Sequence, residues 1–171
     1  INWDAGQFAL GTINYSLADH TPHPPGYYLF VQSGRLLTFV THDVNISFII
    51  LAGLAALSAL LLFYKTVLTI TQNTASALLA SLFLFLNPVF WFCRSVALTY
   101  TFEALAASLS LWTSTEIILK KNTRVILFSY PLLAILAGFR PSVILASLPL
   151  LIVQAWYMRH DITLLLKGVL A

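Results

Sequence analysis

The chain has 171 residues, of which 59% are hydrophobic and only 9% charged, and its mean hydropathy is +0.87. Soluble domains contain about 45–50% apolar and about 25% charged residues. High hydrophobicity excludes intrinsic disorder, and a net charge of +3 without a basic stripe excludes nucleic-acid binding. A single cysteine excludes a disulfide framework and a cysteine-based metal site. The class that remains is all-α: a polytopic transmembrane helical bundle. Because the first residue is Ile1 and not Met, we expect the chain to be part of a longer protein.

Residues 1–45 are predicted to form an external loop with interfacial helices. The segment 5–18 can form a short amphipathic helix. The segment 27–40 predicts a second helix, which at 14 residues is too short to cross a bilayer. Between them lies a turn that its prolines make rigid, Pro22-His23-Pro24-Pro25-Gly26.

Five further segments are apolar enough to lie in a membrane, where a spanning helix needs about 20 residues. They are 46–64, 74–92, 98–118, 125–138 and 141–158. The first two carry no charge. The fourth is only 14 residues long, which is about 21 Å of helix. Because Pro141 favours a chain break, we expect Arg140 to lie below the outer surface, within the membrane half of the protein. Together with the loop, these segments make residues 1–171 part of one transmembrane domain.

The basic residues predict the orientation, because cytoplasmic loops carry an excess of Lys and Arg. With alternating crossings, one side, taken as cytoplasmic, holds Lys65, Lys120, Lys121, Arg124 and Arg159. The opposite side then collects the candidate chemical groups, which are Asp4, Asp19, His20, His23, Arg94, Glu103 and Arg140. Charges in or beside membrane segments are costly and tend to mark function.

Each of these groups has a functional and a structural interpretation. Asp4 is a candidate general base or a helix cap. His23 could bind phosphate or tune a carboxylate, or bond to the backbone of its turn. Arg94 could contact phosphate or reach toward lipid headgroups. Glu103 suits the start of its helix and could pair with Arg94 or Arg140. Arg140 is the stronger anion site, because a recessed guanidinium demands a partner.

A metal site is a further option from the types of ligand present. Carboxylates and imidazoles from Asp4, His20, His23 and Glu103 could bind a divalent cation. Their spacing shows no tight ligand motif, so we expect no cofactor, with a divalent metal as the alternative.

An acidic residue that precedes a proline-rich turn forms a recognisable pattern. It comprises Asp4-Ala5-Gly6-Gln7-Phe8, His23-Pro24-Pro25-Gly26-Tyr27-Tyr28-Leu29-Phe30 and Gly34-Arg35-Leu36-Leu37. Later in the chain come Arg94-Ser95 and Gly138-Phe139-Arg140-Pro141-Ser142. Together these motifs resemble the GT-C superfamily of integral membrane glycosyltransferases, most closely the branch related to protein O-mannosyltransferases.

The resemblance implies a multi-pass enzyme that transfers a sugar, with inversion, from a polyprenyl-phosphate-linked donor to a hydroxyl acceptor on the non-cytoplasmic face. The acceptor would be a protein, a glycan or a lipid. It implies that Asp4 is the base, that a first span precedes it, and that the substrate is bound by His23, Arg94, Glu103 and Arg140. Many relatives have a second acid beside that aspartate, where this chain has Ala5, which favours a single base. A bacterial inner membrane is the expected location, in preference to the endoplasmic reticulum.

Two other functions fit the residues. A transporter or flippase of a lipid-linked or small anionic substrate would use Arg140 at membrane depth. A non-catalytic assembly subunit would use Arg94, Glu103 and Arg140 only as ion pairs. The enzyme interpretation depends on one geometric expectation, that Asp4 and Arg140 share one lipid-bordered pocket.

Overall fold

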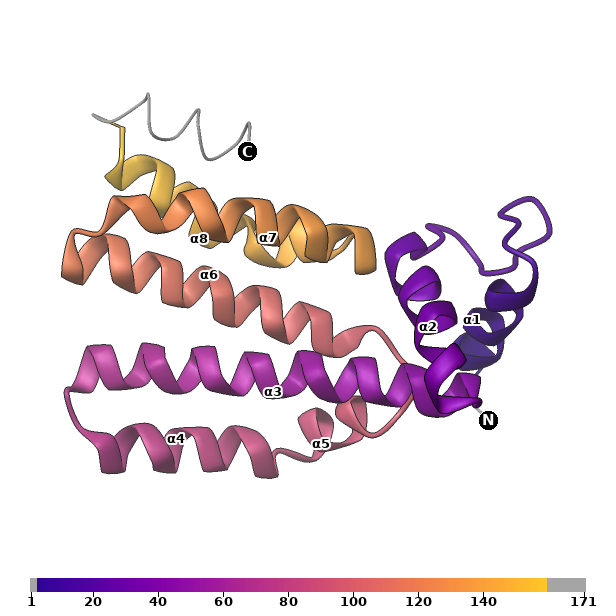
Figure 1. Ribbon diagram of the computed structural model, residues 1–171. Helices are drawn as coiled ribbons and strands as arrows, with labels where there is room; N and C mark the ends of the chain where they lie inside the picture. Colours follow the sequence, from indigo (N-terminus) through magenta and orange to yellow (C-terminus); the bar gives the residue numbers. More distant parts are fainter. Residues whose placement is uncertain (1–2, 160–171) are drawn as a thin grey trace.

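The computed structural model describes residues 3–159, and over this range it is helical with no β-strand (Figure 1). The all-α expectation is therefore confirmed. In chain order the elements are α1 (Trp3–Ile13), α2 (Tyr28–Thr41), α3 (Val44–Thr71), α4 (Thr74–Leu86), α5 (Pro88–Arg94), α6 (Tyr100–Lys120), the 3₁₀ turn η1 (Thr123–Val125), α7 (Ile126–Phe139) and α8 (Val143–Tyr157).

Helices α3 to α8 run back and forth between the two ends of an elongated bundle (Figure 1). Helix α3 packs against α4 on one side and α6 on the other, and α7 and α8 cover α6. The face of α3 buries small side chains, Ala52, Ala55, Ala56 and Ala59, and α6 buries Ala106. Small residues allow the backbones of two helices to approach closely, which explains the long α3–α6 contact.

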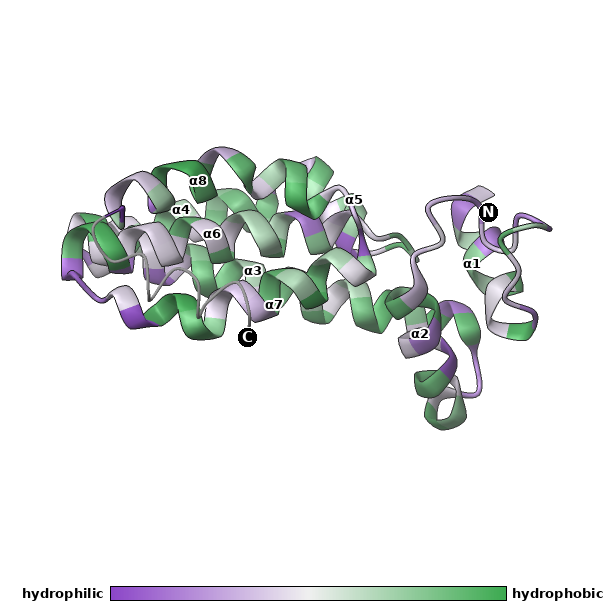
Figure 2. Ribbon diagram, turned by 90° about the horizontal axis from the view of Figure 1, so that it is seen from above, coloured by the Kyte–Doolittle hydropathy of each residue, from purple (hydrophilic) through white to green (hydrophobic). Residues whose placement is uncertain are grey.

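By length and composition, α3 is the one described helix that could cross a membrane. Helices α4 and α5 would form a second span only if the bent pair is counted as one, and η1–α7 and α8 are shorter apolar helices. Helix α6 has 21 residues but contains many Ser and Thr residues, which lower its mean hydropathy. Figure 2 shows hydrophobic residues along the whole bundle and more polar ones near its ends. The membrane character of the described residues therefore rests on α3, and the five predicted membrane segments do not each give a helix of spanning length.

The prediction of one membrane helix over residues 74–92 was wrong, because the structure has two helices there. Helix α4 ends at Leu86, and α5 leaves at an angle of 67°. Pro88 lacks a backbone N–H, and the side-chain oxygen of Asn87 accepts hydrogen bonds from the N–H groups of Val89 and Phe90. A capped N-terminus with proline in the first position starts a new helix, so the chain turns here. The segment 46–64 was too short, because α3 extends to Thr71 and includes Lys65.

The break near Arg140 is where the sequence predicts it. Helix α7 ends at Phe139, and Arg140 is extended, with φ −151° and ψ 106°, as expected for a residue before proline. Helix α8 then starts at Val143. The predicted segments 98–118, 125–138 and 141–158 therefore correspond to α6, α7 and α8 with shifts of only a few residues.

Helices α1 and α2 lie at one end of the bundle, where α3 and α6 begin (Figure 1). A chain of phenylalanine rings joins them to it. Phe8 of α1 packs edge-on to Phe30 of α2, with ring centroids 5.1 Å apart. Phe30 in turn stacks on Phe48 of α3 at 4.6 Å and meets Phe102 of α6 at 5.7 Å. Phe102 stacks on Phe139 of α7 at 4.6 Å, so one aromatic core fixes the N-terminal segment to three helices of the bundle.

Candidate functional site

The loop between α1 and α2 places His23 and Tyr27 over the aromatic core. Gly26 adopts a φ of +99°, which suits glycine, and its carbonyl accepts a hydrogen bond from the Tyr15 hydroxyl at 3.0 Å. Tyr27 follows with a φ of 46°, a left-handed conformation that is rare for a bulky residue. Its ring lies 5.2 Å from that of Phe8 and 5.4 Å from the His23 imidazole. This strained turn directs the Tyr27 side chain against the end of the bundle.

Glu103 and Arg140 form an ion pair at the same end of the bundle. Arg140 Nε donates to Glu103 Oε1 at 2.6 Å, and its Nη1 donates to Thr99 Oγ1 at 2.6 Å. The Ser142 hydroxyl also donates to Glu103 Oε1, and the Arg140 guanidinium lies 4.3 Å from the centre of the Tyr100 ring. The side chains are 16% exposed for Arg140 and 32% for Glu103. Of the two partners that the sequence left open for Glu103, the structure selects Arg140.

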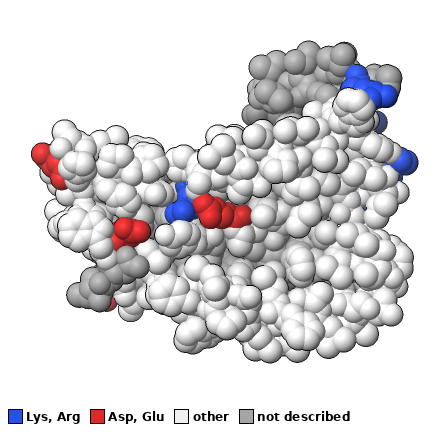
Figure 3. All heavy atoms as spheres, turned by 180° about the vertical axis from the view of Figure 1, so that it is seen from behind, with Lys and Arg blue, Asp and Glu red and all other residues white. Residues whose placement is uncertain are grey.

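The surroundings of the Tyr27 phenol shift its pKa in both directions. Burial raises the pKa of Tyr27 above its ordinary value of 10.0, the Arg140 cation lowers it, and the carboxylates of Asp4 and Glu103 raise it further. Charges influence a titrating group in this way only when they lie near it. Tyr27 therefore lies near the Asp4 carboxylate of α1 and near the Glu103–Arg140 pair, at the end of the bundle where α1 and α2 pack (Figure 1). Figure 3 shows Lys or Arg atoms against Asp or Glu atoms in a hollow of this surface.

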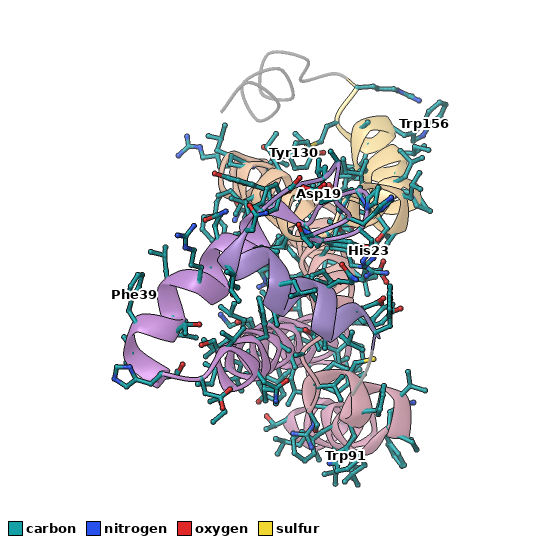
Figure 4. All side chains as sticks on the ribbon, turned by 90° about the vertical axis from the view of Figure 1, so that its right-hand side faces the viewer. Asp19, His23, Phe39, Trp91, Tyr130 and Trp156 are labelled. Atoms are coloured by element: carbon teal, nitrogen blue, oxygen red, sulfur yellow. The ribbon has the colours of Figure 1, made fainter. Side chains whose placement is uncertain are left out.

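Two polar atoms near this cluster are buried without a hydrogen-bond partner. They are Oε1 of Gln7, one helical turn after Asp4, and Nδ1 of His23. Buried polar atoms are usually paired, so these two atoms stand out among the polar groups around Tyr27. The alternative in which His23 bonds to the backbone of its turn has no support at this nitrogen. Figure 4 looks at the bundle end-on and shows how the labelled His23 lies relative to the helix ends.

Arg94 lies apart from the ion pair, at the end of α5. Its guanidinium carbon is 4.0 Å from the centre of the Phe85 ring, and its Nε is buried without a hydrogen-bond partner. It borders a cavity of about 330 Å³ between α3, α4 and α5, whose walls are mostly apolar. Arg94 is thus a cation at the edge of an apolar groove, whereas Arg140 is already paired with a carboxylate.

The remaining outer-face candidates do not join the cluster. Asp19 and His20 are exposed in the α1–α2 loop, where the Asp19 carboxylate accepts a hydrogen bond from the Ser16 hydroxyl at 2.7 Å. Across residues 3–159, no group of three or more His, Cys, Asp or Glu side chains is arranged to hold a metal ion. The four residues named above as metal ligands therefore do not converge.

Reasoning from the sequence missed Tyr27 and three residues that contact the Glu103–Arg140 pair, which are Thr99, Tyr100 and Ser142. Tyr27 follows a Pro-Pro-Gly turn, and an aromatic residue fixed by such a turn is a signal that could have been used. Thr99, Tyr100 and Ser142 flank Glu103 and Arg140 in sequence, and their roles appear only when α6 and the α7–α8 break are brought together.

Three comparisons with known proteins complete the description. No family model, no curated protein and no solved structure matches this chain.

Proposed function

We propose that this chain is part of a membrane-embedded, multi-pass glycosyltransferase that moves a sugar, with inversion, from a polyprenyl-phosphate donor to a hydroxyl acceptor on the non-cytoplasmic face. The observation that carries the proposal is the clustering of a carboxylate, a phenol and a guanidinium at one end of an apolar bundle. The charges of Asp4 and Arg140 both shift the pKa of Tyr27, and α1 and α2 pack on the end of the bundle where α6 begins. The resemblance of the motifs around these residues to GT-C enzymes points to the same reaction.

A membrane setting is supported by the surface of the bundle. Large apolar side chains are exposed along α3, α4 and α8, among them Leu61, Phe83 and Leu145, at 54%, 76% and 72%. Exposed apolar patches of this extent mark contact with lipid or with other protein segments. Helix α3 at 28 residues is about 42 Å long, more than the roughly 30 Å of a hydrocarbon core.

In the proposed reaction the acceptor hydroxyl oxygen attacks the anomeric carbon of the donor sugar on the face opposite the phosphate. The Asp4 carboxylate takes the hydroxyl proton, and the carbon–oxygen bond to the lipid phosphate breaks. The phosphate leaves with the electron pair, and a nearby guanidinium stabilises its growing charge. Asp4 supplies the base, Arg140 supplies the cation on the bundle side, and His23 and Glu103 position the reacting groups.

The test is sugar transfer by membranes that contain the Asp4→Asn variant. Removing a general base typically lowers the rate by about 10²–10⁴-fold. We expect a loss in this range with unchanged expression. Asp19→Asn is the matched control, because it makes the same substitution at an exposed carboxylate of the neighbouring loop. Equal turnover in the Asp4 and Asp19 variants would remove Asp4 as the base.

A second candidate is a non-catalytic assembly subunit, which the mutual neutralisation of Glu103 and Arg140 favours. A charge swap, Glu103→Arg with Arg140→Glu, separates the two functions. The assembly role requires only the pair and tolerates the swap. The enzyme requires a cation facing the leaving phosphate and loses activity when the two charges exchange places.

A further inference from the structure

A groove lies between α3, α4 and α5, apart from the Tyr27 cluster. One face of α3 and the ends of α4 and α5 line it with Ile49, Gly53, Leu57, Leu60, Phe85 and Arg94. The 67° bend at Asn87 ends α4 and carries α5 along α3 (Figure 1). Leu57 is 53% exposed, so the groove opens onto the apolar outside of the bundle. The groove is therefore an apolar surface with a cation in its wall.

The Arg94 guanidinium lies level with the middle of α3. Its central carbon is 4.0 Å from the centre of the Phe85 ring. Phe85 is 12 residues beyond the start of α4 at Asn73. Leu60, on the opposite wall of the groove, is 12 residues before the end of α3 at Gln72. At 1.5 Å per residue, both positions are about 18 Å from that end of α3, whose whole length is about 42 Å.

The depth of Arg94 limits which anion can reach it. With α3 across the membrane, the lipid headgroups lie about 15 Å from the bilayer midplane, at the surfaces of a hydrocarbon core of roughly 30 Å. Lipid phosphates are held at that level, and a free ion loses its hydration if it enters the core. A carboxylate on a second helix lies at the depth that its position in the helix sets. Charged side chains within membrane segments generally pair with one another in this way.

The surroundings of Arg94 favour an anionic side chain. Across residues 3–159, no ion pair includes this guanidinium. Its Nε is buried without a hydrogen-bond acceptor, and the Phe85 ring covers the guanidinium without supplying one. A guanidinium and a carboxylate form short, charge-assisted hydrogen bonds, which are stronger than those between neutral groups.

A second copy of the chain does not supply this carboxylate. Within residues 3–159, helices α3 to α8 carry two acidic side chains, Glu103 and Glu116, both on α6. Glu103 pairs with Arg140, and Glu116 pairs with Lys120. Both carboxylates also lie near the ends of α6, away from its middle. A helix of a different protein therefore fits the groove better than a second copy does.

We propose that this groove binds a membrane helix of a partner protein, apolar along its length, with an Asp or Glu at its middle that forms an ion pair with Arg94. Gly53 leaves room for it, because an added Cβ there meets no atom within 4 Å. Small residues allow the backbones of two helices to approach closely. The proposal rests on the membrane location argued above and not on sugar transfer.

The experiment uses a synthetic Leu-Ala helix of about 20 residues, with Asp at its centre and a dansyl group at one end. Binding is measured as energy transfer from the tryptophans of the protein to the dansyl group in phosphatidylcholine vesicles. We expect the Asp peptide to bind about tenfold or more tightly than peptides with Asn or Lys at the same position, because the ion pair adds charge-assisted hydrogen bonds. This comparison leaves the protein unchanged, so it does not depend on how a variant folds.

Substitutions in the groove form the second arm of the experiment. Arg94→Gln should abolish the preference for the Asp peptide, and Arg94→Lys should keep part of it, because the charge stays and the bidentate geometry is lost. Arg94→Glu should reverse the preference, so that the Lys peptide binds best. Gly53→Leu fills the groove and should weaken binding of the Asp peptide by about tenfold or more. Ala75→Leu, at an exposed position on α4, is the matched control and should change nothing.

Three results would overturn the proposal. The first is equal binding of the Asp and Asn peptides, and the second is a preference for Asp that persists in Arg94→Gln. The third is loss of the Asp peptide from vesicles in which phosphatidylglycerol replaces phosphatidylcholine, because that result assigns the groove to an anionic lipid. The readout is peptide binding, so a protein without transferase activity can still pass or fail this test.

Discussion

Removal of the Arg140 guanidinium tests how far the Glu103 ion pair holds the end of the bundle together. Arg140→Gln breaks the 2.6 Å contact with Glu103, the hydrogen bond to Thr99 and the packing over Tyr100. Breaking a fully buried pair by removing one partner costs about 3–5 kcal/mol, because a charge is left buried alone. Glu103 is 32% exposed and keeps the Ser142 hydroxyl, so water and that donor offset part of the cost.

We therefore expect Arg140→Gln to lower the free energy of unfolding by about 2 kcal/mol, less than the fully buried value. For a chain of this length, that corresponds to a fall in Tm of roughly 4–8 °C. The matched control is Lys65→Gln, which removes a cation from an exposed position on α3. Substitutions at such exposed positions usually change the free energy of unfolding by no more than about 0.5 kcal/mol.

The assay is thermal and chemical unfolding in detergent of Arg140→Gln, Glu103→Gln and the double variant. In the double variant neither charge remains unpaired, so its loss should be smaller than the sum of the two single losses by about 1 kcal/mol or more. Strict additivity, or a loss no greater than that of Lys65→Gln, would show that the pair does not stabilise the fold.

Three further changes probe the packing, the helix break and the buried phenol. Gly34→Ala should destabilise the protein by about 1–3 kcal/mol in a thermal unfolding scan, because the new Cβ would lie 2.2 Å from the Phe48 ring. Gly53→Ala is the control, since an added Cβ there meets open space, and it should be neutral or stabilising in the same scan. Asn87→Ala removes the acceptor for two N–H groups and should cost about 1 kcal/mol, seen as faster hydrogen exchange at Val89 and Phe90. The pKa of Tyr27 in the folded protein lies above its ordinary value of 10.0, so the folded protein binds the phenol proton more tightly than the unfolded chain does. The contribution of Tyr27 to stability is therefore complete below pH 10.0 and is lost as the pH rises above that value. Tyr27→Phe should reduce this loss of stability at alkaline pH, which tyrosinate absorbance and unfolding experiments would measure.

Hydropathy and proline positions were enough to predict most of the helices. Arg140 and Pro141 predict the α7–α8 break because a residue before proline avoids helical geometry. Asn87 and Pro88 form the same kind of break, but the run around them carries no charge, so hydropathy alone predicts one span there. Hydropathy averages over a window and does not register a local cap, which here turns the chain by 67°.

The chemistry of the site was only partly predictable. Residue types and topology put Asp4, Glu103 and Arg140 at the same end of the bundle. When consecutive helices run in opposite directions, every second connection between them lies at the same end. The choice of partner for Glu103 depends on contacts between residues 37 positions apart, and sequence alone left Arg94 and Arg140 equally available. Tyr27 was missed because its role depends on a left-handed backbone conformation, which no residue type at that position specifies.

The two guanidinium groups differ in their surroundings. Arg140 is paired with Glu103 and contacts Thr99 and Tyr100, so its position is fixed and part of its charge is offset. Such a pair can orient a substrate phosphate without attracting every anion in the membrane. Arg94 has an aromatic ring beneath it and an Nε without an acceptor, so it retains its full charge at the groove. In the proposed reaction, the preorganised Arg140 is therefore the better placed cation for a phosphate that leaves near Asp4.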